Sequence, residues 1–158
     1  MRWDLPELTE DAMTSYLRVT CGGVHATQAW GEGADAFPRA VVHVSDTGPL
    51  SEDEEWSDYR ELILTIAVQT EAAPELSTSG EVISTIRERH ARAVSAVCDA
   101  VFVSDLNARL VAQDIPAIAF SRAKMETTAR GVEVSPDGVP HLVTTLTGMV
   151  IAEPVTGS

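Results

Sequence analysis

RELILTIAVQTEA, residues 60–72, carries the clearest structural signal in this chain. Every second position holds a large aliphatic residue, namely Leu62, Leu64, Ile66 and Val68. A period of two is typical of a strand that packs one face against a core. The residues between them are only half polar, so we expect the second face to be covered too. The segment therefore predicts a long strand.

A second strand is expected at PRAVVHVSDTG, residues 38–48, where three valines lie between Pro38 and an Asp-Thr-Gly-Pro turn signal. We expect the two strands to form an antiparallel pair. The acidic segment SEDEEWSDYREL, residues 51–62, would then lie at the tip of that pair.

Two helices are expected before and after these strands. In LTEDAMTSYLRVTCGG, residues 8–23, Thr9 or Asp11 can cap the start, and Gly22-Gly23 ends the helix. Its apolar stripe is Ala12, Met13, Tyr16 and Leu17. Residues 25–37, HATQAWGEGADAF, are expected to form a loop that buries Trp30.

The longest helix is expected at STSGEVISTIRERHARAVSAVCDAVF, residues 77–102, with Thr78 and Glu81 as a capping box. Its apolar face is Val82, Ile86, His90, Ala93, Val97 and Val101. A short helix over residues 104–114 follows, capped by Ser104 or Asp105.

Three extended segments complete the chain, at residues 117–127, 130–136 and 141–155, and Asp137-Gly138 is a hairpin signal between the last two. The element order predicts an α+β fold. We expect a mostly antiparallel sheet of about four or five strands, with a long central helix and an N-terminal helix packed on one face. Residues 1–155 are expected to be one domain, and residues 156–158 a flexible tail.

Composition limits the function classes. The chain has 158 residues with 24 acidic and 11 basic side chains, a formal net charge of −13. So few cations argue against an extended surface that binds phosphates. Cys21 and Cys98 are isolated and predict no disulfide. MRWDLPELTEDAM lacks the apolar core of a secretory signal, and no run is long enough to cross a bilayer, so we expect synthesis in a cytoplasm.

Catalytic and cofactor motifs are missing from the sequence. The four histidines, His25, His43, His90 and His141, form no ligand-like pair and are interpreted as structural. Cys98 is interpreted as a core residue. No G-x-S-x-G occurs, and neither Gly22-Gly23 nor GEGAD fits a nucleotide-binding turn. We therefore expect no catalytic residues, no bound metal, no cofactor and no enzyme activity.

The acidic segment has six carboxylates in twelve residues. A calcium loop starting at Asp46 has its glycine too early, and one starting at Asp53 has none. Two-metal sites gather carboxylates from several strand ends rather than from one consecutive run. A solvated loop and a functional electrostatic surface both remain open.

The layout resembles the tail-terminator and neck (tail-completion) proteins of long-tailed bacteriophages. The resemblance rests on the order of six segments and covers nearly the whole chain. They are EDAMTSYLRV, FPRAVVHVSD leading through the acidic connection into RELILTIAVQTEA, VISTIRERHARAVSAVCDAV, SDLNARLV and HLVTTLTGMVIAEPV. The family has no invariant motif, so no site residue is carried over from it. CGGVHATQAWGEGADAF has no counterpart that we can place.

This resemblance implies a virion protein, made in the host cytoplasm, that forms a hexameric ring and joins the tail tube to the head. It implies tail-tube and head–tail connector proteins as partners, with double-stranded DNA passing through without specific binding and no membrane contact. Terminator and head-side neck protein both remain open.

The acidic segment then becomes a candidate channel lining, formed by Glu52, Asp53, Glu54, Glu55 and Asp58. Trp56 and Tyr59 interrupt the acids and are candidate subunit contacts. Two alternatives stay open, an acidic DNA mimic that inhibits a nucleic-acid enzyme and a small hydrolase with a carboxylate site.

Overall fold

The computed structural model describes residues 5–28, 36–49, 60–71, 75–113, 118–134 and 140–154. Five strands form one sheet in the order β1-β2-β3-β7-β6. They are β1 (His25–Gln28), β2 (Arg39–Pro49), β3 (Arg60–Glu71), β6 (Ile118–Val134) and β7 (Pro140–Pro154). Only β1 and β2 run parallel among the paired strands of this sheet. The predicted α+β fold with a mostly antiparallel sheet is confirmed.

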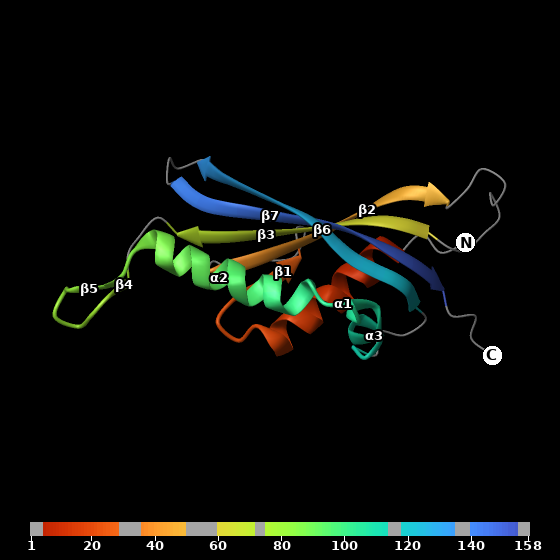
Figure 1. Cartoon of the computed structure of the whole chain (residues 1–158), viewed down its shortest axis with the longest axis horizontal. Helices are drawn as coiled ribbons and strands as arrows, with labels where there is room; N and C mark the ends of the chain where they lie inside the picture. The colour runs from red at the N-terminus through yellow and green to blue at the C-terminus, as the bar shows by residue number, and fades with distance from the viewer. Residues whose placement is uncertain are drawn as a thin grey trace.

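Three helices lie on one side of this sheet (Figure 1). They are α1 (Leu5–Thr20), α2 (Ile86–Val101) and α3 (Leu106–Val111). The side chain of Tyr16 ties them together, because its hydroxyl donates to the Ala100 carbonyl at 2.6 Å and accepts from Arg109 at 3.0 Å. A small hairpin of β4 (Glu75–Leu76) and β5 (Val82–Ser84) extends beyond the start of α2 (Figure 1).

Strand β3 confirms the predicted alternation. Its helix-side residues Leu62, Leu64, Ile66 and Val68 are completely buried. The other side was expected to be covered too, and this is wrong for the described residues, where no helix lies over it (Figure 1). Ile63 on that side is 39% exposed, and its neighbours along β3 are small or polar, so the face tolerates water.

Strands β2 and β3 form the expected antiparallel pair, in register from Arg39 with Gln69 to Asp46 with Leu62. After an irregularity the pairing ends at Pro49 and Arg60. The acidic connection, residues 50–59, therefore leaves and re-enters the sheet at paired positions.

Helix α1 begins earlier than predicted. It starts at Leu5, with Pro6 in the first turn, where a missing N–H is tolerated. Thr9 is not its cap, because it is buried inside the helix and its hydroxyl donates to the Leu5 carbonyl at 2.8 Å. The predicted stripe of Ala12, Met13, Tyr16 and Leu17 is confirmed as buried.

Residues 25–28 were expected to belong to a loop, and this is wrong. They form the edge strand β1, which α1 holds in place. Arg18 donates to the Ala26 carbonyl at 3.1 Å, and the side-chain amide of Gln28 donates to Asp11. Four residues are too few to show a period in the sequence. Trp30 lies outside the described residues.

Helix α2 starts at Ile86, about two turns later than predicted. Its cap is Thr85, whose hydroxyl accepts from the backbone N–H of Glu88 at 3.2 Å, so the Thr78–Glu81 capping box is wrong. Val82 lies in β5 and is 59% exposed rather than on the apolar face. Ile86 is only half-buried. The remaining members of that face, His90, Ala93, Val97 and Val101, are confirmed as buried.

The short helix is α3, and its N-cap position is Asp105, as one of the two predicted options had it. The Asp105 carboxylate makes no capping bond and instead accepts from Arg109 at 2.9 Å. Leu106 and Leu110 are completely buried and carry the packing of this helix.

Strand β6 replaces two of the predicted extended segments. Residues 117–127 and 130–136 were expected to be separate, but residues 118–134 form one strand along β7. The pairing starts at Val134 with Pro140, so β6 and β7 make the expected hairpin, although Asp137-Gly138 lies outside the described residues. Two register shifts, between Phe120 and Arg122 and between Met125 and Thr127, mark bulges.

Candidate functional site

The predicted site residues all belong to the acidic connection, which lies outside the described residues. This applies to Glu52, Asp53, Glu54, Glu55, Trp56, Asp58 and Tyr59. The structure describes the base of the connection. There Arg60 is buried, and its Nε lies 3.8 Å from Asp46 Oδ2, within ion-pair distance but without hydrogen-bond geometry. The cation that follows the acidic run is thus buried at the base of the connection.

His90 connects α2 to the centre of the sheet. Its Nδ1 lies 2.8 Å from the Thr70 hydroxyl and its Nε2 lies 2.8 Å from the Thr144 hydroxyl. Burial lowers the pKa of His90, and the positive charge of Arg130 lowers it further. The neutral imidazole donates to one threonine and accepts from the other, which satisfies both nitrogens. The prediction of a structural histidine is confirmed here.

A buried carboxylate that the sequence did not lead us to predict lies beside strand β2. Glu10 of α1 is 6% exposed and accepts a hydrogen bond from the backbone N–H of Val44 at 2.9 Å. Its Oε1 also lies 3.4 Å from Nδ1 of His43. Beyond the end of β1, Glu10 therefore takes the place of a strand partner for β2. Glu10 lies within the apolar stripe of α1, and this position was the feature of the sequence that could have indicated a buried carboxylate.

Neither cysteine is a reactive thiol in this environment. Cys21 is buried and its thiol donates to the Ala96 carbonyl at 3.4 Å, while Cys98 is half-buried against the core. Burial raises the pKa of both thiols, and the nearby Asp99 charge raises it further. Both side chains therefore remain protonated at neutral pH. Since the thiolate is the nucleophilic form of cysteine, neither thiol is reactive.

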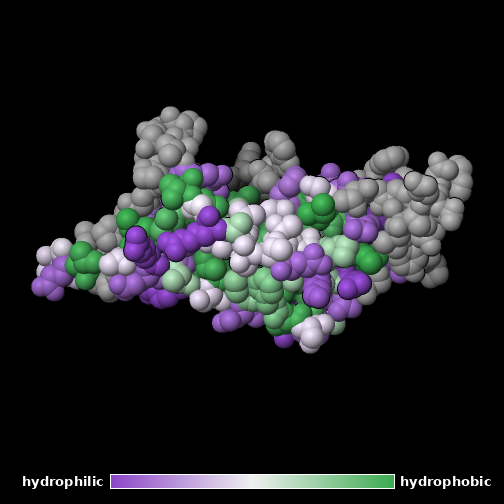
Figure 2. All heavy atoms as spheres, turned by 45° about the horizontal axis from the view of Figure 1, so that its top comes forward, coloured by the Kyte–Doolittle hydropathy of each residue, from purple (hydrophilic) through white to green (hydrophobic). Residues whose placement is uncertain are grey.

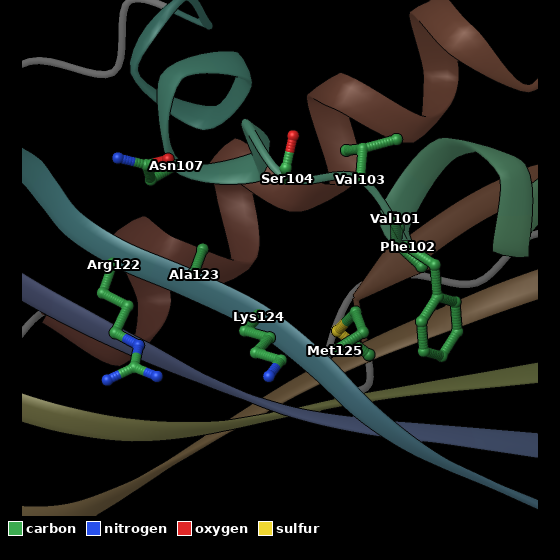
Figure 3. A pocket seen from close by; sticks show the side chains of 9 residues that line it. All are labelled: Val101, Phe102, Val103, Ser104, Asn107, Arg122, Ala123, Lys124 and Met125. Carbon is green, nitrogen blue, oxygen red and sulfur yellow. The ribbon is translucent and has the colours of Figure 1, made fainter.

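A hollow of about 490 Å³ lies where α2 ends, beside β6. Figure 3 shows Ala123 pointing from β6 toward α3, while Arg122 and Lys124 point to the other side of the strand. Phe102 at its rim is 44% exposed. Because the side chains of Arg122 and Lys124 point away, Ser104 and Asn107 supply the polar side chains of the hollow, and its lining offers Ser104 no neighbouring base.

A second hollow of about 400 Å³ lies between the first turns of α2 and the far half of β6. We call it the arginine groove, formed by Arg87, His90, Ala91, Val94, Ser95, Arg130 and Thr144. Two arginines thus line one hollow together with the small apolar residues Ala91 and Val94. Figure 2 shows strongly hydrophilic side chains next to hydrophobic ones in the half of the molecule that carries β4 and β5.

The two arginines of this groove have no carboxylate partner within the described part of the chain. Arg87 lies outside the apolar face predicted for its helix, and no pattern in the sequence brings Arg130 near it. The bulge after Met125 does this. It shifts the alternation so that Arg130 pairs with Thr144 on the helix side of the sheet.

Among the described residues no group of three or more His, Cys, Asp or Glu side chains is arranged to hold a metal ion. None of the described helices is both long enough and apolar enough to span a bilayer. The chain matches no protein-family model, and a search of curated proteins gave no match.

Proposed function

We propose that this chain is a virion assembly protein of a bacteriophage or prophage, acting as a tail terminator or neck ring component that caps the tail tube and joins it to the head. The acidic connection carries this proposal. Five of its ten residues, 50–59, are acidic, and it is attached to the sheet through the Pro49–Arg60 pair. Its charge is therefore concentrated at one end of the fold.

A ring gives this charge a physical role. In a hexamer each subunit would contribute Glu52, Asp53, Glu54, Glu55 and Asp58 to a negative belt around the channel. DNA phosphates are repelled by such a belt, so the genome slides past without forming lasting contacts. Trp56 and Tyr59 would supply apolar contact area between subunits.

The described side chains favour a protein that acts through its surfaces. His90, which has the closest hydroxyl–imidazole contacts, is 4% exposed, and threonine hydroxyls hold both of its ring nitrogens. The contact of His43 with Ser45 is long, at 3.4 Å. Partners of the proposed ring are a tail-tube protein, head–tail connector proteins and passing double-stranded DNA, and its location is the virion.

The proposal is tested by neutralising the acids. The substitutions Glu52→Gln, Asp53→Asn, Glu54→Gln and Glu55→Gln should leave ring assembly intact, because they preserve side-chain size. The neutralised ring should retain linear double-stranded DNA at low salt, measured by co-sedimentation, whereas the unaltered ring should not. A neutralised ring that still retains no DNA at low salt contradicts the channel role.

Native mass measurement separates this function from its main alternative. A closed oligomer supports a ring protein. A stable one-to-one complex with a DNA-binding enzyme, captured from host extract and lost at high salt, would instead support an acidic inhibitor.

A further inference from the structure

The arginine groove is unusual in a chain with a net charge of −13. Arg87 comes from α2 and Arg130 from β6, and both line the same hollow. Two like charges that converge repel each other, and no described carboxylate pairs with either one. An anionic group placed between them would remove that repulsion and form charge-assisted hydrogen bonds.

The strand beside the groove is open to a partner. Strand β6 is the last strand of the sheet, and no described strand pairs with its outer edge. Residues 126–133 are exposed at every position, so neither face of this stretch is covered. An unpaired edge presents backbone donors and acceptors that an extended segment can use.

The groove also offers apolar contact. Ala91 and Val94 line the same hollow as the two arginines. A segment that fits must combine carboxylates with a flat apolar side chain, since arginine binds carboxylates and also stacks on aromatic rings. In this chain WSDY, residues 56–59, has that composition.

We propose that the arginine groove and the adjoining edge of β6 receive the acidic connection of a second copy of this chain, with Asp58 between Arg87 and Arg130. This inference rests on the proposed ring function and specifies how neighbouring subunits join. Residues 56–59 make the contact. Asp58 thereby moves from the belt described above to the subunit contact, and Glu52, Asp53, Glu54 and Glu55 remain free to line the channel.

A subunit cannot fill its own groove. Arg130 pairs with Thr144, which pairs with Val68, eight positions along β3 from Arg60. At roughly 3.4 Å per residue the groove lies about 27 Å from the base of the acidic connection. Ten residues span at most about 36 Å, so a connection fixed at both ends reaches only about 18 Å.

The contact is therefore head-to-tail, because the donating end and the receiving groove are different surfaces of the subunit. A contact of this kind generates a closed ring when its rotation closes and a filament when it does not. The base of the connection and the groove lie toward opposite ends of the sheet (Figure 1), as such an arrangement requires.

The test compares two double variants of the full chain that remove the same charge. Arg87→Gln with Arg130→Gln alters the groove. Arg122→Gln with Lys124→Gln is the matched control, because these side chains point to the other side of β6 (Figure 3) and also lack a described carboxylate partner. Circular dichroism confirms that each variant is folded, and native mass spectrometry over a concentration series gives the subunit dissociation constant.

We expect the groove variant to raise the dissociation constant at least tenfold and the control to change it less than twofold. Reversing the charges, with Asp58→Arg in a chain that also carries Arg87→Glu and Arg130→Glu, should restore association. Equal losses in both double variants, or no rescue, overturn the inference.

A wild-type oligomer that is unaffected by the groove variant also overturns the inference and leaves the ring function standing. A wild-type chain that never associates contradicts the ring function itself. Loss of DNA binding in the groove variant, with association unchanged, would assign the groove to nucleic acid instead and also overturns the inference.

Discussion

Replacing Gly148 by alanine should destabilise the protein through the bulge that aims Arg130. Gly148 lies on β7 opposite Met125, next to the register shift in β6. A β-carbon added there would lie 2.5 Å from the Lys124 carbonyl oxygen, 2.6 Å from Met125 Sδ and 2.7 Å from Met125 Cα. Two of these atoms belong to the backbone, so the strands must separate to admit the methyl group.

Overpacking of this kind costs about 1–3 kcal/mol of unfolding free energy. In a chain of this size each kcal/mol lowers the melting temperature by about 2–4 °C, so we expect a decrease of about 2–12 °C. Urea titration followed by circular dichroism gives the free energy, and a thermal scan gives the midpoint. Because β6 must shift, the subunit dissociation constant should also rise.

Gly131 is the matched control, since it lies on the same strand pair and a β-carbon there would meet nothing within 4 Å. Gly131→Ala should leave stability unchanged or raise it by up to about 1 kcal/mol, because alanine restricts the unfolded chain. A Gly148→Ala protein as stable as the wild type, or equal destabilisation by both substitutions, would refute the close approach of β6 and β7 as the reason for glycine at this position.

Two further predictions concern α2. The lowered pKa of His90 means that the unfolded chain takes up a proton first as the pH falls, so stability should drop below about pH 6.5 until the folded pKa is reached. His90→Gln should flatten the slope of unfolding free energy between pH 7.5 and 5. Parallel slopes for wild type and His90→Gln would contradict this. Thr85→Ala removes the cap of α2 and should cost about 1 kcal/mol in urea titrations, against no change for Thr78→Ala. A larger loss from Thr78→Ala would return the helix start to the earlier capping box.

The sequence was most informative where burial follows a regular period. The alternation of β3 and the helical face from His90 to Val101 are local patterns, and both are buried as predicted. The start of α2 was predicted wrongly because Thr78–Glu81 and Thr85–Glu88 both have capping-box spacing. Only the pairing of β4 with β5 distinguishes them, and that is a tertiary contact.

The errors at the sheet edges have a similar origin. Strand β1 has four residues, and its place depends on Arg18 and Asp11 of α1 rather than on a pattern of its own. Strand β6 was divided in two because Thr127, Thr128 and Gly131 resemble a break. Pairing with β7 overrides that local preference.

The candidate site divides in the same way. The acidic connection is visible in the sequence as a composition, and its attachment at Pro49 and Arg60 follows from the predicted strand pair. The arginine groove is not visible, because Arg87 and Arg130 are 43 positions apart and meet only through the bulge in β6.

Electron microscopy of the purified chain, combined with its native mass, tests the ring most directly. We predict closed rings of six subunits with a central hole, and a mass of about 101 kDa, six times the 16.9 kDa of one chain. Particles that remain monomeric at every concentration, or that form only open chains without a central hole, would contradict it.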